Sequence, residues 1–186
     1  MENSVKRLKK ESAILVVVDL QERLIPAMRE GKKAAAQAAK LIRGCEALGV
    51  PVITTQQYTK GLGETVAEVR EAYAAFSCIE KSAFSAMGEP LFVEALKKSG
   101  RKSVLICGVE THVCVLQSSL DLLAAGYGVF LATDAVSSRK EMDERPGTAR
   151  MIQAGVVPTS VESALFELLD NDSKSDMFKT ISKLIK

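Results

Sequence analysis

The stretch 103–134, SVLICGVETHVCVLQSSLDLLAAGYGVFLATD, constrains the fold more than any other part of the chain. Its first residues, 104–106, form a short apolar run of the kind that is buried in a parallel sheet. Leucine and valine then recur at helical spacing as far as Gly126, and a second apolar run follows at 129–132. Two buried strands joined by a helix predict a βαβ crossover, whose two strands run parallel.

Cys114 falls just past the end of the first of these strands, in the first turn of the crossover helix. Unpaired amide groups and the positive end of the helix dipole favour a thiolate there, which makes Cys114 a candidate nucleophile. From position alone, a small buried hydrophobic residue is an equally good interpretation. The single histidine, His112, lies about 200° around the helix from Cys114. We therefore interpret His112 as a capping or polar contact, and a base for Cys114 must come from elsewhere.

Two charged residues close other predicted strands. The apolar run 13–18 ends at Asp19, and a carboxylate at the carboxyl end of a buried strand is well placed for function. A turn or helix cap explains Asp19 equally well at this point. Lys81 follows a short strand at about 78–80, and in isolation it would be an ordinary solvated lysine.

The remaining patterns alternate strands with helices along the chain. We expect further strands near 52–54 and 156–157. We expect helices near 31–48, 64–73, 90–99 and 145–154, a helix that starts at a Thr159/Glu162 capping box, and a lysine-rich amphipathic docking helix in the tail.

Six strands that alternate with helices predict one α/β domain over 1–186, a three-layer α/β/α doubly wound fold. Its six-stranded parallel sheet has the order 3-2-1-4-5-6. In that order strands one and four are neighbours at the switch point, where ligands of such sheets bind. Asp19, Lys81 and the Cys114 loop would then face one pocket.

Composition excludes several classes of function. The formal net charge of +2 gives no reason to expect a nucleic acid or membrane partner. No apolar run is long enough to span a membrane, and the first residues have no signal-peptide pattern, so we expect a cytoplasmic protein. One histidine and four cysteines without CxxC spacing predict no metal site.

Three segments also carry a resemblance to a known family. VVVDLQ, IEKSAFS and CGVETHVCV resemble the signature segments of the isochorismatase-like cysteine hydrolases. TTQQYTKGLGETV and FKTISKLIK resemble the isochorismatase domain-containing subgroup. The resemblance implies that Asp19, Lys81 and Cys114 form a catalytic triad. It also implies a cis peptide between Val109 and Glu110, and an oxyanion hole made by the backbone N–H groups of Glu110 and Cys114.

The sequence also departs from two better known branches of that family. Nicotinamidases bind a metal through an aspartate and histidines, whereas this chain has only His112. Isochorismatases proper typically lack the cysteine. The resemblance therefore implies a hydrolase without metal or cofactor that acts on a small amide-type C–N bond through a Cys114 thioester. The alternative is a catalytically idle protein of this fold that serves as an interaction module or thiol sensor.

Two further expectations concern the surface around the site. Gln21, Gln57, Tyr58 and Phe84 should line the substrate pocket if their loops fold over the switch point. The apolar face of the tail helix is more surface than a small domain readily buries, and members of the family it resembles are commonly oligomers. We therefore expect a homo-oligomer that binds a small-molecule substrate.

Overall fold

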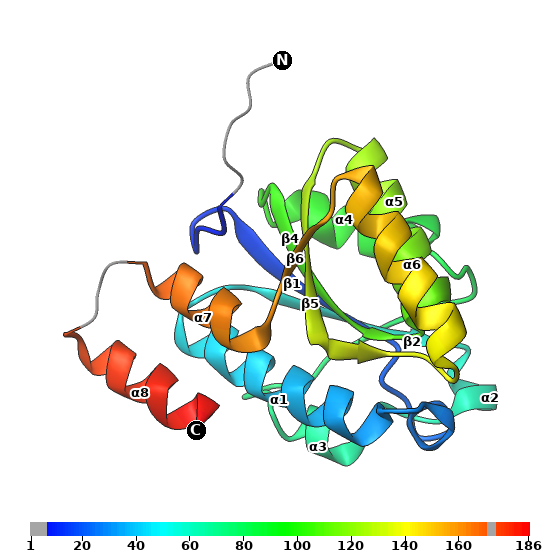
Figure 1. Cartoon of the computed structure of the whole chain (residues 1–186), viewed down its shortest axis with the longest axis horizontal. Coiled ribbons are helices and arrows are strands. Elements are labelled where there is room, and N and C mark those ends of the chain that lie inside the picture. Colours follow the sequence, from blue (N-terminus) through cyan, green and yellow to red (C-terminus); the bar gives the residue numbers. More distant parts are fainter. Residues whose placement is uncertain (1–6, 171–173) are drawn as a thin grey trace.

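The computed structural model describes residues 7–170 and 174–186 (Figure 1). Its strands are β1 (Ala13–Val18), β2 (Val52–Gln57), β3 (Ile79–Lys81), β4 (Ser103–Val109), β5 (Gly128–Ser137) and β6 (Val157–Thr159). Its α-helices are α1 (Gly31–Ala47), α2 (Thr59–Leu62), α3 (Ala67–Arg70), α4 (Pro90–Lys98), α5 (Leu116–Ala124), α6 (Glu141–Ala154), α7 (Val161–Leu169) and α8 (Asp176–Ile185).

The strands form one six-stranded sheet in the order β3-β2-β1-β4-β5-β6, and all of its pairs are parallel. The predicted fold class and strand order are therefore confirmed. Val16 of β1 lies between Ile53 of β2 and Ile106 of β4. The chain passes from β1 to β2 on one side and enters β4 on the other, so the switch point lies between β1 and β4.

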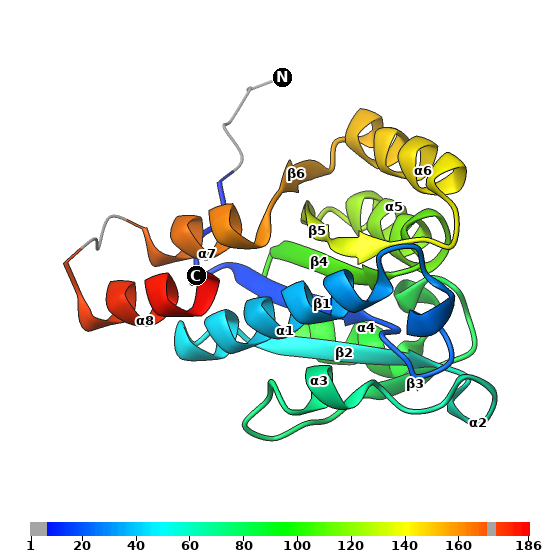
Figure 2. The same ribbon diagram turned by 60° about the horizontal axis from the view of Figure 1, so that its bottom comes forward.

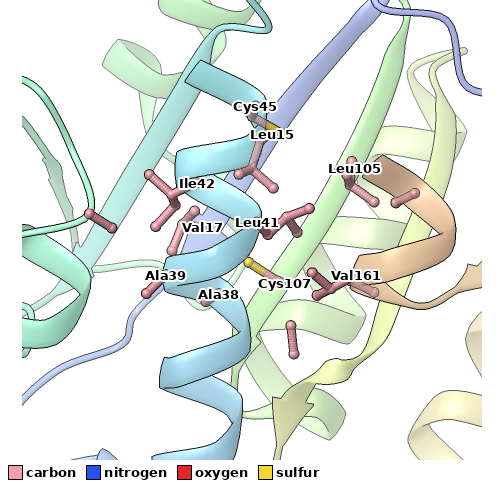
Figure 3. Packing of buried hydrophobic residues seen from close by; sticks show 14 of the residues in the cluster. Leu15, Val17, Ala38, Ala39, Leu41, Ile42, Cys45, Leu105, Cys107 and Val161 are labelled. Carbon is pink, nitrogen blue, oxygen red and sulfur yellow. The ribbon is translucent and has the colours of Figure 1, made fainter. Parts of the chain in front are cut away.

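Helices cover both faces of the sheet (Figures 1 and 2). Side chains alternate along β1, so Leu15 and Val17 belong to the core beneath α1 and α7, while Val16 belongs to the core beneath α4, α5 and α6. Figure 3 shows the first of these cores, where the small residues Ala38 and Ala39 let α1 lie close to the sheet. A sheet buried on both faces explains why its strands are apolar throughout.

Several predicted elements differ in detail from the structure. The segment expected as a helix over 64–73 contains only α3, after a separate short helix, α2. The helix expected from 145 begins at Glu141, because acidic residues in its first turn suit the helix dipole and the interior Pro146 does not end it. The capping box at Thr159 is wrong by one residue. Thr159 still pairs with Ala132 in the sheet, and the Ser160 hydroxyl accepts the capping bond from the Ser163 amide.

Cys114 also lies in a different local structure from the one expected. A π-helical turn over Thr111–Val115 precedes α5, and the amide of Val115 donates to the carbonyl of Glu110, five residues back. The cysteine is therefore in a π turn and not in the first turn of the α-helix. π turns are rare in proteins, but those that occur often lie at functional sites.

The tail helix α8 packs within the same chain. Its Ile181 is fully buried against the core beneath α1, and Leu184 and Ile185 are partly buried there. Phe178 lies 6.0 Å from Phe166 of α7 between ring centroids. The apolar face of α8 thus has a partner inside the molecule, and it no longer supplies a reason for self-association.

Gly108 allows β1 and β4 to approach each other beside the switch point. Its φ is +119°, and a Cβ added there would lie 2.0 Å from the carbonyl oxygen of Val18. Gly126 also has a positive φ, +85°, but nothing lies within 4 Å of its added Cβ.

We expect Gly108→Ala to lower the free energy of unfolding by about 1–3 kcal/mol more than Gly126→Ala, because only the first substitution adds a clash to the strained backbone. Urea unfolding followed by circular dichroism measures both variants. Equal losses would contradict the close approach of the two strands.

Candidate active site

Asp19 follows β1 directly, and residues of two neighbouring strands hold it. Its φ is +52°, a left-handed conformation that is uncommon outside glycine. Its amide donates to the carbonyl of Thr55 at 3.2 Å. The Thr55 hydroxyl donates to Asp19 Oδ1 at 2.7 Å, and Lys81 Nζ binds Asp19 Oδ2 at 2.7 Å. The aspartate is fully buried, so these partners define its environment.

Lys81 is the last residue of β3, and its side chain is also fully buried. Besides Asp19, Nζ donates to Gln57 Oε1 at 2.7 Å and to the carbonyls of Ala83 and Phe84 at 3.2 and 3.1 Å. A buried lysine is rare unless it is paired, because burial disfavours the ammonium. The four oxygen atoms that accept from the Lys81 ammonium compensate for the hydration that it loses on burial.

Cys114 completes the cluster from the π turn. Its side chain lies close to both charged residues. Asp19 and Lys81 therefore act on the thiol as charges and as hydrogen-bond partners. The structure therefore brings Asp19, Lys81 and Cys114 together from three separate segments, at the carboxyl edge of the sheet. Cys114 is 8% exposed, so the sulfur lies just beneath the surface.

The protonation of this thiol differs from the expectation. Burial, followed by the negative charge of Asp19, raises the pKa of Cys114 to about 12, and the positive charge of Lys81 opposes that rise. The helix dipole was expected to favour the thiolate, and the positive charge of Lys81 acts in the same direction. Burial outweighs them, so the thiol is favoured over the thiolate at neutral pH.

A raised pKa alone does not distinguish Cys114 from the other buried cysteines. Burial also raises the pKa of Cys107 to about 12, and it raises the pKa of Cys45 strongly. Neighbouring groups add to the effect of burial there, Asp134 at Cys107, and Cys107 and Glu46 at Cys45. Cys114 differs because a carboxylate and an ammonium both reach its sulfur.

The backbone before Cys114 has a defined shape. The peptide bond between Val109 and Glu110 is cis. The Glu110 carbonyl accepts from the amides of Val113 and Val115, which ties it to the π turn. Its carboxylate accepts from the amide and Nε of Arg139 at 3.1 and 3.0 Å. These contacts hold the Glu110 peptide in place from both sides.

The four residues predicted to line the pocket fall into two pairs. Gln21 is fully buried, and its carboxamide bonds the backbone N–H and carbonyl of Gln57 and the carbonyl of Gly63, so it supports the loops. The Gln57 carboxamide accepts a hydrogen bond from Lys81 Nζ and donates one to the Ser82 carbonyl. Both carboxamides therefore serve as internal supports.

The other pair consists of the aromatic residues Tyr58 and Phe84, which are 55% and 56% exposed. The Tyr58 amide donates to the Lys81 carbonyl, and the Phe84 carbonyl accepts from Lys81 Nζ. Both backbones therefore contact Lys81, while both residues are largely exposed.

His112 does not contribute to the cluster. Its Nδ1 lies 3.0 Å from the Ser138 hydroxyl, and its backbone and Cβ pack against Gly147 of α6. This is a polar contact near the start of the helix, as the spacing from Cys114 predicted.

Thr55 and Arg139 were not singled out in the sequence, although both contact site residues. The signal for Thr55 was present. The run TTQQ at the end of a buried strand places polar side chains where no solvent reaches them, and such groups need partners.

Within 7–170 and 174–186, no three His, Cys, Asp or Glu side chains are placed to share a metal ion. No helix in these ranges is both long and apolar enough to cross a bilayer.

Comparison with known proteins places the chain in a family. Residues 13–163 match the model of the isochorismatase domain. The secreted isochorismatase effector Isc1 of Phytophthora sojae is 40% identical, over 97% of this chain and 87% of its own. Isochorismatase domain-containing protein 2A of Mus musculus is 37% identical, over 98% of this chain and 87% of its own.

Several solved structures are also similar to this chain. The MAR1 ribonuclease from Caenorhabditis elegans has a TM-score of 0.90 and 36% identity, with 97% of this chain and 92% of that one covered. The YcaC gene product from Escherichia coli, described as an octameric hydrolase of unknown specificity, has a TM-score of 0.90 and 28% identity, with 99% and 92% covered. YcaC from Pseudomonas aeruginosa, described with hexane-2,5-diol and covalent acrylamide, has the same TM-score and identity, with 97% and 92% covered. The chain therefore belongs to the isochorismatase-like superfamily, within its isochorismatase domain-containing subgroup.

Proposed function

We propose that the protein is a metal-independent cysteine hydrolase that cleaves a small amide-type C–N bond through a thioester on Cys114. Membership of the isochorismatase family supports a hydrolase. The observation that carries the proposed cysteine mechanism is the buried ion pair of Asp19 and Lys81, 2.7 Å long, which lies next to the Cys114 thiol. Taking two charges out of water is unfavourable, so their burial beside a thiol needs an explanation. A thiol sensor or an interaction module gives none, and catalysis does.

The first half of the reaction forms the thioester. The Cys114 thiol passes its proton to Asp19 as the sulfur attacks the substrate carbonyl. The amides of Glu110 and Cys114 stabilise the negative charge that develops on the carbonyl oxygen. Asp19 then returns the proton to the nitrogen, the C–N bond breaks, and an amine or ammonia leaves.

The second half releases the acid. Asp19 takes a proton from a water molecule, which attacks the thioester carbonyl, and the C–S bond breaks as the sulfur regains a proton from Asp19. Lys81 takes no part in the proton transfers. Its contact with Asp19 Oδ2 keeps the carboxylate in place, and its charge offsets the negative charge that appears on the sulfur.

The surroundings of the sulfur favour a small substrate. Only 8% of Cys114 is exposed, and the exposed rings of Tyr58 and Phe84 lie on residues that border the triad. A small, partly apolar molecule without strong charge suits such an entrance. We propose a small-molecule substrate and not RNA, although one structural neighbour is named a ribonuclease, because a polymer would not reach a nearly buried thiol and the net charge is only +2.

A panel of small amides and carbamates tests the function. Each compound is incubated with the full chain, the reaction is quenched in acid, and the protein is mapped by peptide mass spectrometry. We expect an acyl or carbamoyl adduct on the Cys114 peptide together with the released amine. Turnover of a compound with no adduct at Cys114, under quench conditions that preserve a reference thioester, would refute a covalent route.

We also propose that the protein self-associates. The octameric Escherichia coli neighbour supports this, as do the exposed apolar side chains Phe84 and Leu91, which are 56% and 62% exposed. Light scattering at micromolar concentration should give a mass that is a multiple of 20.0 kDa, and a mass of 20.0 kDa would refute the proposal. The cytoplasmic location stays a prediction, because the Phytophthora relative is named as secreted.

A further inference from the structure

We propose that Thr55 is a positioning residue, which holds the Asp19 carboxylate in the orientation that accepts the Cys114 proton. This inference rests on the function proposed above, because it assigns Asp19 the role of base.

Thr55 makes two contacts to the same aspartate. Its hydroxyl donates to Asp19 Oδ1 at 2.7 Å, and its carbonyl accepts from the Asp19 amide at 3.2 Å. Thr55 is fully buried, so water does not compete for either bond. The strand β2 therefore fixes both the backbone and the side chain of a residue whose own backbone is in a left-handed conformation.

The second carboxylate oxygen is fixed from the other side. Lys81 Nζ holds Oδ2 at 2.7 Å, so each oxygen carries one donor and the carboxylate cannot turn freely about its Cβ–Cγ bond. An ionised carboxylate offers about four lone-pair directions, so two remain for other partners. The titratable groups that face Asp19 are Lys81 from β3 and Cys114 from the π turn. With Lys81 on Oδ2 and Thr55 on Oδ1, a remaining lone pair stays directed to the thiol.

The neighbouring residue provides a matched control. Thr54 is also a buried threonine of β2, 2% exposed, but its hydroxyl bonds the Tyr73 hydroxyl. Successive side chains of a strand point to opposite faces. Thr54→Val and Thr55→Val therefore remove the same hydroxyl from the same strand, and only the second one touches Asp19.

Alkylation of Cys114 by iodoacetamide measures the proton transfer without a known substrate. The thiol proton passes to Asp19, the sulfur bonds the acetamide carbon, and iodide leaves. We follow the Cys114 peptide by mass spectrometry from about pH 5 to about pH 11. The parent protein should show a plateau near neutral pH, where Asp19 accepts the proton, and a steep alkaline limb, where hydroxide removes it.

We expect Thr55→Val to lower the plateau about tenfold, which is the effect of one hydrogen bond to a charged group, and to leave the alkaline limb unchanged. Thr55→Ser should restore the plateau, and Thr54→Val should not alter it. A general loosening of the structure would instead move both parts of the profile. If Thr55→Val does not fold by circular dichroism, Thr55→Ala gives the same comparison.

Two results would overturn the inference, and they have different meanings. If Asp19→Asn loses the plateau while Thr55→Val keeps it, Thr55 does not position the base, and the proposed function stands. If Asp19→Asn keeps the plateau as well, Asp19 is not the base, and both proposals fail.

Discussion

Cys114→Ala abolishes hydrolysis of any substrate that the amide and carbamate panel identifies. The variant retains Asp19, Lys81 and the backbone of the π turn, so only the nucleophile is lost. Removing the nucleophile of a triad enzyme lowers turnover by several powers of ten, and we expect a loss of at least about a thousandfold. Rates of product release, measured with equal amounts of folded protein, test this directly.

Cys78→Ala is the matched control for that experiment. Cys78 is exposed, and its sulfur lies 3.0 Å from Gln56 Oε1, away from the ion pair. Its removal should leave turnover close to that of the parent protein. If Cys114→Ala keeps full activity, or if both variants lose it equally, Cys114 is not the nucleophile.

The raised pKa of Cys114 defines how this nucleophile works at neutral pH. Because burial raises the pKa of Cys114 to about 12, the proposed mechanism starts from the thiol and not from a preformed thiolate. In that mechanism the proton leaves during the attack, and Asp19 accepts it. Hydrolysis should therefore not rise tenfold per pH unit between neutral pH and pH 9, which it would do if only the thiolate reacted. A slope of that size would contradict the role of Asp19.

Much of the architecture could be predicted because the chemistry of the strands is simple. The buried runs that begin at Ala13 and Val104 are apolar on both faces, and each ends at a polar or glycine residue. Alternation of such runs with helices leaves few topologies for six strands, so the order of the sheet followed. The proximity of Asp19, Lys81 and Cys114 followed in the same way, because the carboxyl ends of neighbouring parallel strands meet at one edge.

Other features depend on contacts that sequence spacing does not reveal. The roles of Gln21 and Gln57 depend on which backbone groups their carboxamides reach, and in the structure these groups lie 36 and 42 residues from Gln21 and 25 residues from Gln57. The protonation of Cys114 depends on the depth of its burial, which outweighs the charge of Lys81. The docking of α8 depends on apolar side chains of α1 and α7 that come together only in the folded chain.

Lys81→Met should lower the free energy of unfolding by about 3–5 kcal/mol, because it leaves the charge of Asp19 buried without its ion-pair partner. Methionine has nearly the length of the lysine stem, so little packing is lost. Asp19→Asn should lower the free energy of unfolding by less than Lys81→Met does. The ammonium of Lys81 would then keep the oxygens of Gln57, Ala83 and Phe84.

The double variant Asp19→Asn/Lys81→Met separates loss of the pair from loss of packing. It contains neither charge, so it should recover a large part of the stability that Lys81→Met loses, although it is inactive. Urea unfolding of the parent and the three variants gives the coupling energy. Lys179→Met, in an exposed ion pair with Asp176, is the surface control and should change stability little. If the double variant is as unstable as Lys81→Met, the uncompensated charge is not the cause. If neither Lys81→Met nor the double variant is less stable than the parent protein, water reaches Asp19 and the site is less enclosed than its burial indicates.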